Sequence, residues 1–168
     1  MHEQNQSITL RTANLTDLDA INRVIASAVM SWQLAERVKR LSLSSHQYSE
    51  IDFRHLQFVL AQTANTPQTQ IVGVAAWQAA DALNTPQNKR ALLLHGIYVD
   101  AQHHRQGIGQ ALFARAQQAA IEQPYDGLLV KAQTDASGFF IAQGMQPLPQ
   151  QNDRQYSNRF WKPLAVGQ

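Results

Sequence analysis

Leu92–Leu112 reads LLLHGIYVDAQHHRQGIGQAL and carries the clearest structural signal in the 168-residue chain. The apolar run Ala91–Val99 has the length and composition of a strand buried on both faces. A polar loop follows, and Gly107 opens a helix whose inner stripe consists of apolar residues at helical spacing. The stretch therefore predicts a mid-sheet strand, a loop and a helix in direct succession.

The glycines of this turn indicate a ligand. Gly107 and Gly109 allow the backbone to turn sharply and its N–H groups to approach a bound molecule, and the helix N-terminus supplies unpaired donors and a positive dipole end. Arg105, His103 and His104 stand beside the turn and add side-chain donors. A diphosphate suits such a corner. The alternative is that the two glycines only form a tight loop before a helix.

Two other phosphate-binding motifs do not fit this turn. A dinucleotide fingerprint requires a third small residue where this chain has Leu112. A P-loop requires a Lys followed by Ser or Thr after its second glycine, and neither is present. Both motifs are therefore disfavoured.

The flanking sequence alternates between strand and helix patterns. Ile8–Thr12 has the period of a half-buried strand, and a helix follows in which Thr16 and Asp19 resemble a capping box and apolar residues recur as far as Trp32. The Ser-rich stretch Ser42–Ser49 is interpreted as a loop. Strands are predicted at Leu56–Ala61, Gln70–Trp77, Gly127–Ala132 and Tyr156–Lys162, a hairpin turn at Ala64–Gln68, and a short helix at Asp135–Gln143 stopped by Gly144.

This order predicts one mixed sheet covered by helices, of the α/β or α+β class. Neither a repeat nor an interdomain linker is visible, so residues 1–168 are interpreted as a single domain. Hydrophobic residues make up 44% and charged residues 15%, which fits a globular protein and neither a disordered nor a coiled-coil chain.

Composition also limits the chemistry and the partners. The chain has no Cys, which excludes a thiol nucleophile, an iron–sulfur cluster and Cys-ligated zinc, and we expect no metal site. The pI near 9.2 comes from scattered basic residues, a pattern that does not indicate nucleic-acid binding. No run approaches the ~18 apolar residues of a membrane span, and Met1–Ser7 is polar, so we expect no membrane partner and a cytoplasmic location.

Two segments match known motifs. One is a pattern of Arg or Gln, two residues, Gly, one residue, and Gly or Ala, in which Gly107 and Gly109 match and His104 stands where the pattern has Arg or Gln. Ala132–Met145 reads AQTDASGFFIAQGM, in which an Ala precedes an aromatic pair and then a Gly followed by an apolar residue. In this order the two segments resemble motifs A and B of the GNAT superfamily of acyl-CoA-dependent N-acyltransferases. Gln33–Arg54 matches no part of the family pattern.

The resemblance implies a fold and an activity. The fold would be a GNAT-like single domain with a mixed, mostly antiparallel sheet of about six or seven strands, splayed between strands 4 and 5, and about four helices. The activity would be direct transfer of the acetyl group of acetyl-CoA to an amine, without a covalent enzyme intermediate. The main chain of Ile97–Val99 would pair with the pantetheine arm and the amides of Gln106–Gln110 would hold the diphosphate. The residues assigned to the cosubstrate are Ile97, Tyr98, Val99, His104, Arg105, Gln106, Gly107, Ile108, Gly109, Gln110, Gln133, Phe139 and Phe140.

Acetyl transfer requires groups that handle protons. His95 is the candidate base because imidazole titrates near neutral pH, and the alternative is a core histidine bonded to a backbone carbonyl. Many relatives carry Tyr as the general acid where this chain has Phe140, which has no proton to donate. The thiolate then leaves unaided or through water, or takes a proton from Tyr156, the weak candidate acid, or from Tyr98.

The acceptor and the partners are less defined. A small-molecule primary amine is the expected acceptor. The alternatives are a non-catalytic acyl-CoA sensor, suggested by Phe140, and an acetyltransferase of a protein terminus or an aminoacylated RNA, suggested by the basic pI. A homodimer is compatible with the sequence. Several residues could contact an acceptor or simply form solvated surface and core: Arg37, Lys39, Arg40, His46, Trp32, Tyr48 and Trp161.

Overall fold

The structure is a computed structural model that describes residues 7–64 and 68–164. Backbone contacts divide the chain into two compact units, and each is described by itself. Unit 1 consists of Met1–Ala76 and Gly96–Leu112, and unit 2 of Trp77–His95 and Phe113–Gln168. Among the described residues, no helix has both the length and the apolar composition needed to cross a membrane.

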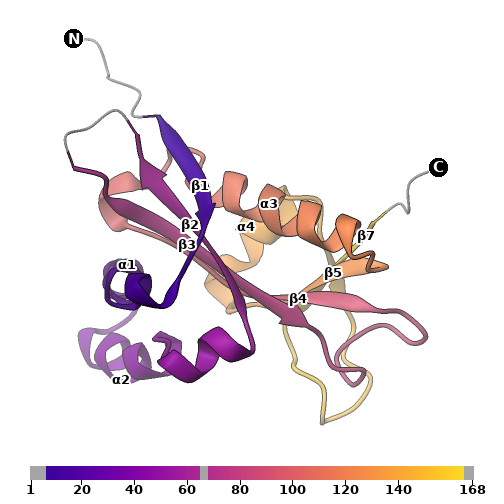
Figure 1. Cartoon of the computed structure of the whole chain (residues 1–168). Coiled ribbons are helices and arrows are strands. Elements are labelled where there is room, and N and C mark those ends of the chain that lie inside the picture. Colours follow the sequence, from indigo (N-terminus) through magenta and orange to yellow (C-terminus); the bar gives the residue numbers. More distant parts are fainter. Residues whose placement is uncertain (1–6, 65–67, 165–168) are drawn as a thin grey trace. The chain divides into compact units, whose positions relative to one another are not determined.

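The strands form a seven-stranded sheet with the hydrogen-bonded order β1-β2-β3-β4-β5-β7-β6 (Figure 1). Antiparallel pairing joins β1 to β2, β5 to β7 and β6 to β7, and β4 runs parallel to β5. The predicted α/β class with a mixed, mostly antiparallel sheet is therefore confirmed. The strands are β1 (Ile8–Thr12), β2 (Gln57–Thr63), β3 (Ile71–Ala79), β4 (Ala91–Val99), β5 (Gly127–Lys131), β6 (Gln146–Leu148) and β7 (Arg159–Pro163).

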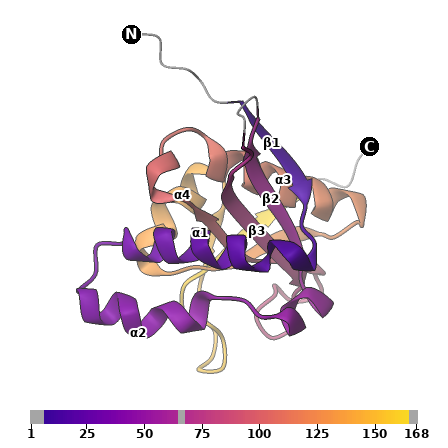
Figure 2. The same cartoon turned by 60° about the vertical axis from the view of Figure 1, so that its left-hand side comes forward.

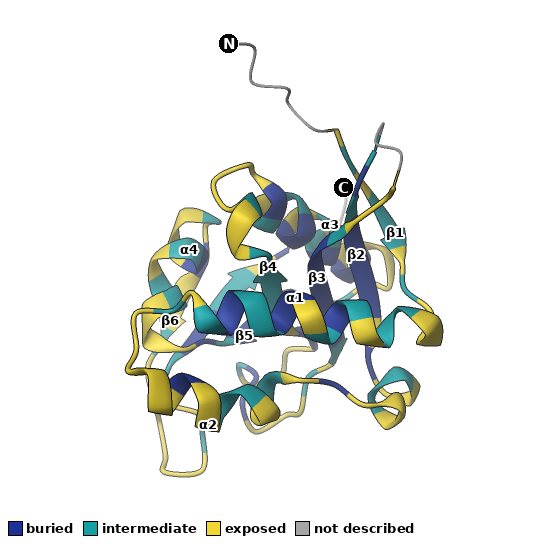
Figure 3. Ribbon diagram, turned by 90° about the vertical axis from the view of Figure 1, so that its left-hand side faces the viewer, coloured by how far each residue is buried: buried dark blue, intermediate teal, exposed yellow. Residues whose placement is uncertain are grey.

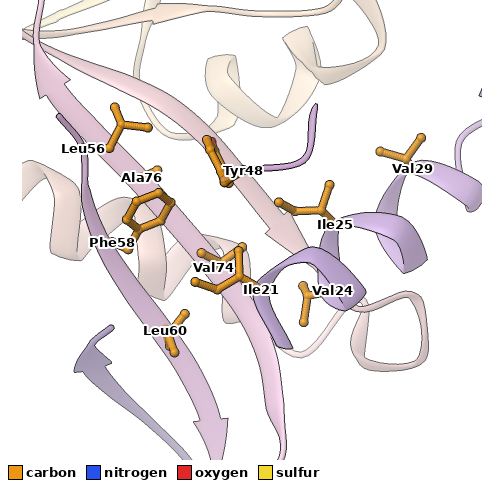
Figure 4. Packing of buried hydrophobic residues seen from close by; sticks show 10 residues of the cluster. All are labelled: Ile21, Val24, Ile25, Val29, Tyr48, Leu56, Phe58, Leu60, Val74 and Ala76. Carbon is orange, nitrogen blue, oxygen red and sulfur yellow. The ribbon is translucent and has the colours of Figure 1, made fainter. Parts of the chain in front are cut away.

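Unit 1 is built on a core between helix α1 (Leu18–Met30) and strands β2 and β3 (Figure 4). In α1, buried residues recur at helical spacing and form its apolar stripe. Helix α2 (Glu36–His46) runs beside α1 (Figure 2). The core cluster consists of Ile21, Val24, Ile25, Val29, Tyr48, Leu56, Phe58, Leu60, Val74 and Ala76.

The start of the first helical region differs from the prediction. A short 3-10 helix, Leu15–Asp17, precedes α1, and its capping box is made by Asn14 and Asp17, not by Thr16 and Asp19. The Asn14 Oδ1 accepts a bond from the Thr16 N–H at 3.0 Å, and the Asn14 N–H donates to Asp17 Oδ2 at 2.9 Å. Asn caps at least as well as Thr because its short amide reaches the same backbone donors.

The predicted loop Ser42–Ser49 is wrong over its first half, because α2 continues to His46. The hydroxyls of Ser42 and Ser45 each donate a hydrogen bond to the carbonyl oxygen three residues earlier, at 3.1 and 2.6 Å. These bonds lie within the helix, so the serine side chains do not draw the backbone into a turn. Most of α2 is exposed (Figure 3). Lys39 is its buried residue, and its Nζ donates to the Met30 carbonyl at the end of α1, where a cation offsets the negative helix end.

The first turn of helix α3 (Ile108–Glu122) approaches β3 closely at Gly73. A Cβ on Gly73 would lie 2.9 Å from Ile108 Cγ2 and 3.1 Å from Leu112 Cδ1, closer than side chains tolerate. Ile108 and Leu112 are both fully buried. Glycine at this position therefore allows the N-terminus of α3 to pack directly on the strand.

Unit 2 contains the parallel pair and the C-terminal strands. Strand β4 pairs with β5 over four residues, from Ala91 opposite Gly127 to Leu94 opposite Val130. Beyond these pairs β4 continues to Val99. This is the arrangement that the predicted splay between the strands requires, and the splay stays a prediction. The predicted strand Tyr156–Lys162 begins only at Arg159, whose buried guanidinium donates to the carbonyls of Tyr156, Asn84 and Pro149.

Other local predictions have mixed outcomes. Helix α4 is Ser137–Ala142, preceded by a 3-10 turn, and it ends at Gly144 with a φ of 86°, as predicted. Strand β6 was not predicted, because three residues carry too little pattern. Strands β2 and β3 follow the predicted hairpin order, with Thr63 N–H donating to the Gln70 carbonyl at 2.9 Å. Residues 65–67 of the predicted turn lie outside the described residues.

We expect Asp17 to stabilise the fold in a pH-dependent way. Hydrogen bonds from the Arg11 guanidinium, at 2.8 and 2.9 Å, hold the pKa of Asp17 below its usual value. The stabilisation is therefore complete above the unfolded pKa of about 3.9 and is lost as pH falls through the lower folded value. In urea unfolding, Asp17→Asn should cost about 1 kcal/mol at pH 7, and the difference from the parent should shrink below pH 4. The exposed Asp153→Asn serves as the control, and a constant difference for Asp17→Asn down to pH 2 contradicts the assignment.

Candidate functional site

The first backbone amides of the loop that joins β4 to α3 donate hydrogen bonds to other parts of unit 1. The N–H of Asp100 donates to the Val72 carbonyl at 2.8 Å, and the N–H of Ala101 donates to Ser27 Oγ at 3.0 Å. Asp100 Oδ1 accepts from the Gln102 N–H at 2.9 Å and so caps the short 3-10 helix Ala101–His103. These bonds fix the start of the loop to β3 and α1 within unit 1.

The second half of the loop presents its amides differently. Gly107 has a φ of 77°, and a Cβ placed on it meets no heavy atom within 4 Å. The Ala111 N–H donates to the Gly107 carbonyl at 3.0 Å as the helix begins. The amides of Ile108, Gly109 and Gln110 therefore precede the helical ladder, and a helix has no carbonyl to offer them. We call the open space at Gly107 and these donors the candidate anion cradle, because donors at a helix N-terminus are of the kind that binds anions.

The basic residues of the loop differ in what they can offer. Arg105 is exposed, with a φ of 63° that places it in the left-handed region beside Gly107. His104 Nε2 lies 3.0 Å from the Val99 carbonyl, so that ring anchors the loop to the end of β4. His103 Nδ1 lies 3.6 Å from Asp100 Oδ1 and is buried. Of the three predicted donors, Arg105 is the one whose side chain extends from the loop without a bond described.

The predicted burial of β4 on both faces is wrong beyond Leu94. His95 is exposed, and residues 96–99 are half-buried. The alternative of a core histidine at position 95 is therefore wrong. Ile97, Tyr98 and Val99 remain accessible in part, and they lead directly into the loop that ends at the anion cradle.

Tyr98 contacts an aromatic group contributed by α2 and the segments around it. Its Oη lies 2.9 Å from His46 Nδ1, and the Trp32 ring meets the His46 ring edge-on at 5.0 Å. A Cβ on Gly96 would lie 2.7 Å from Tyr98 Cε2 and 3.3 Å from Tyr48 Oη. Burial raises the pKa of Tyr98 to about 12 and raises that of Tyr48 further, so both phenols stay neutral. The sequence offered His46 as a residue that could contact an acceptor or lie on a solvated basic face, and it gave no sign of the contact with Tyr98.

The other predicted site residues belong to unit 2. Phe140 is 6% exposed and packs among Phe113, Phe139 and Phe160, with ring centroids 5.2–6.4 Å apart. Its ring is therefore a core residue, and Phe139 beside it is half-buried. Gln133 is exposed at the start of the α4 region.

Two further candidates have mainly local roles. The exposed Tyr156 is held through its backbone, since its N–H donates to Asn84 Oδ1 at 2.9 Å and its carbonyl accepts from Arg159. Asp135 lies in the first turn of the 3-10 helix, but the N-cap is Gln133 and has no side-chain cap bond. Within residues 7–64 and 68–164, no group of three or more His, Asp or Glu is placed to hold a metal ion.

Comparison with known proteins gives consistent matches. Residues 33–158 match the family model described as an acetyltransferase (GNAT) domain, and this range includes Gln33–Arg54 and crosses both units. N-acetyltransferase 8F1 of Rattus norvegicus is 27% identical over 115 residues, which is 67% of this chain. That range is 48% of the rat protein, so the chain spans about half the length of the curated relative it matches.

Solved structures match over most of the chain. A GNAT family acetyltransferase from Brucella melitensis in complex with acetyl-CoA aligns with a TM-score of 0.65 and 12% identity, covering 95% of this chain and 90% of that one. AtaT complexed with acetyl-methionyl-tRNAfMet aligns with a TM-score of 0.60 and 20% identity, covering 94% of this chain and 95% of that one. At these identities the likeness shows the fold alone.

We expect Gly107→Val to remove the anion cradle. Valine is strained at a φ of 77°, and its side chain would occupy the open space beside Gly107 at the start of α3. Binding of acetyl-CoA, measured by calorimetry, should weaken by at least about tenfold, the loss of a single charge-assisted contact. Gly144→Val, at a φ of 86°, is the matched control, because it carries the same backbone strain away from the loop. Equal affinity in the Gly107 variant and its parent contradicts the cradle.

Proposed function

Because the chain belongs to the GNAT acetyltransferase family, we propose that it transfers the acetyl group of acetyl-CoA to a primary amine of a small molecule. The transfer is direct, within a complex that holds both substrates. The proposal includes a single domain of residues 1–168, since the family match crosses both units, and a cytoplasmic location.

The observation that carries this proposal is the candidate anion cradle, the backbone amides at the start of α3 beside Gly107. Amides 100–102 are bonded within unit 1, whereas Ile108, Gly109 and Gln110 follow a glycine with open space beside it. A diphosphate fits such a donor set, because its charge suits the helix N-terminus and its oxygens accept several N–H bonds. Arg105 and Gln106, both exposed, extend this edge. When bound, acetyl-CoA supplies an activated acyl group as its thioester.

His95 is the proposed base. An amine is mostly protonated at neutral pH, and only the neutral form attacks, so a base must take a proton from the ammonium. His95 is exposed to solvent on β4, and imidazole changes its charge near neutral pH. Water then carries the proton away.

The acid position of the family is vacant. The Phe140 ring is packed in an aromatic cluster and has no hydroxyl. Tyr156 remains the weak candidate acid, exposed on a loop of unit 2. A thiol of pKa about 8.5 leaves readily as the thiolate, so we rank water or no acid ahead of Tyr156.

The proposal is tested by thiol release from acetyl-CoA over a panel of amines. Acetylation of a small primary amine supports it. Binding of acetyl-CoA without turnover on any amine supports the acyl-CoA sensor that Phe140 suggests. Acetylation of an aminoacylated tRNA in preference to every free amine supports the macromolecular alternative, and a fold neighbour has been solved with acetyl-methionyl-tRNAfMet.

We expect His95→Gln to lower kcat/KM for an alkylamine by on the order of 100-fold near pH 7. The imidazole loses its base form as pH falls, so the parent should show an acid limb in kcat/KM near neutrality that the variant lacks. His55→Gln, an exposed histidine of unit 1, is the control and should keep the profile. If the acid limb persists in His95→Gln, His95 is not the base.

A further inference from the structure

The pair formed by Tyr98 and His46 joins two parts of unit 1 that are far apart in sequence. Tyr98 lies on β4, and His46 is the last residue of α2. Their bond of 2.9 Å connects a phenol oxygen to an imidazole nitrogen, and the Trp32 ring meets the same imidazole edge-on with the ring centroids 5.0 Å apart. The pair is half-buried, so it is shielded without being sealed from a ligand.

The Tyr98 ring occupies space that is open because residue 96 is a glycine. Gly96 stands two residues earlier on the same face of β4, and a methyl there would collide with the Tyr98 ring at 2.7 Å. Ala at this position of a strand would otherwise be tolerated. The glycine thus lets the phenol lie against the strand, where it reaches His46.

The two groups have complementary acid–base character. Burial raises the pKa of Tyr98 to about 12, so its oxygen keeps one proton and still has a lone pair. A neutral imidazole accepts a proton readily near neutral pH. Tyr48 is the other titratable group against this pair, and with Asp52 near it, it stays a neutral phenol. A proton can therefore enter at Tyr98 Oη as another leaves it for His46 Nδ1.

We propose that Tyr98 and His46 form a proton relay for the acetyl transfer, with Tyr98 contacting the acceptor nitrogen and His46 acting through Tyr98. The proposal rests on the proposed function, in which the main chain of Ile97–Val99 lies along the pantetheine arm. The Tyr98 side chain rises from that segment. His46 is thus the positioning and proton-accepting partner of a catalytic tyrosine.

The step balances without another reactant. A neutral amine attacks the thioester carbon, the N–C bond forms, and the nitrogen becomes positively charged while it still carries the proton to be lost. That proton passes to Tyr98 Oη, and the Tyr98 proton passes to His46 Nδ1. The C–S bond breaks with its electron pair on sulfur, leaving an imidazolium that returns its proton to the thiolate or to water.

The relay is separable from the role of His95 by the choice of acceptor. Hydroxylamine is already neutral at about pH 7.5, so it needs no base before attack, but its nitrogen still loses a proton afterwards. With hydroxylamine as the probe, His46→Gln and Tyr98→Phe should each lower kcat by on the order of 10–100-fold. His55→Gln, an exposed histidine of unit 1, is the surface control and should lose less than about threefold.

Four further measurements distinguish a relay from a structural role. The kcat of the double variant His46→Gln/Tyr98→Phe should lie within about threefold of the kcat of either single variant, because the two residues act as one unit. Added imidazole should restore part of the rate of His46→Ala. Acetyl-CoA affinity by calorimetry should stay within about threefold of the parent. Gly96→Ala, which displaces the Tyr98 ring and keeps both groups, should also lower kcat.

Failure of the relay and failure of the proposed function give different results. If the parent turns over hydroxylamine, or the best amine of the panel, and His46→Gln and Tyr98→Phe keep kcat within twofold, the relay is wrong and the function stands. Rate losses that are additive, and that imidazole does not restore, also overturn it. If the parent neither binds acetyl-CoA nor releases thiol with any acceptor, the proposed function fails and the relay fails with it.

Discussion

The close approach of β3 to the first turn of α3 leaves no room for a side chain at Gly73, and the arrangement of unit 1 depends on it. Ile108 and Leu112 fill that space, and their burial fixes where α3 begins. The loop before α3 is tied to the same strand through Asp100 and Val72. Both ends of the loop are thus anchored on β3, so the amides between them are presented in a fixed direction. Preorganised donors of this kind bind an anion without the cost of ordering the chain.

Some polar groups of this loop form hydrogen bonds within unit 1, and others are the groups we propose for ligand binding. Its early amides and the His104 ring are bonded to unit 1, and the amides from Ile108 onward face a glycine with nothing beside it. Buried or half-buried polar groups are normally paired, and the first amides of a helix have no acceptor within it, so we propose the start of α3 as the site for an external acceptor. The chain belongs to an acetyltransferase family, and acetyl-CoA, the cosubstrate we propose for it, carries a diphosphate that donors of this kind can bind.

Aromatic residues have opposite roles in the two units. In unit 2, Phe140 packs with Phe139 and Phe160 and contributes apolar contact area. In unit 1, Tyr98 combines ring contacts with a hydrogen bond to His46, so it carries a polar group at a half-buried position. The hydroxyl that many relatives have in motif B is absent at Phe140, and a phenol is instead held at the end of β4. In the proposed relay, the tyrosine that handles the proton therefore lies on β4 and not in motif B.

The sequence by itself determined the features that depend on local patterns. The bounds of β1 and β4, the glycine start of α3, the Asp100 cap and the stop at Gly144 follow from residues a few positions apart. Tertiary structure decided whether Ser42–His46 is helical, that Lys39 caps α1, and that His46 meets Tyr98 across 52 positions. Helix propensity is too weak to fix a Ser-rich end, and contacts between distant segments leave no periodic signal in the chain, because they arise only when the core has packed.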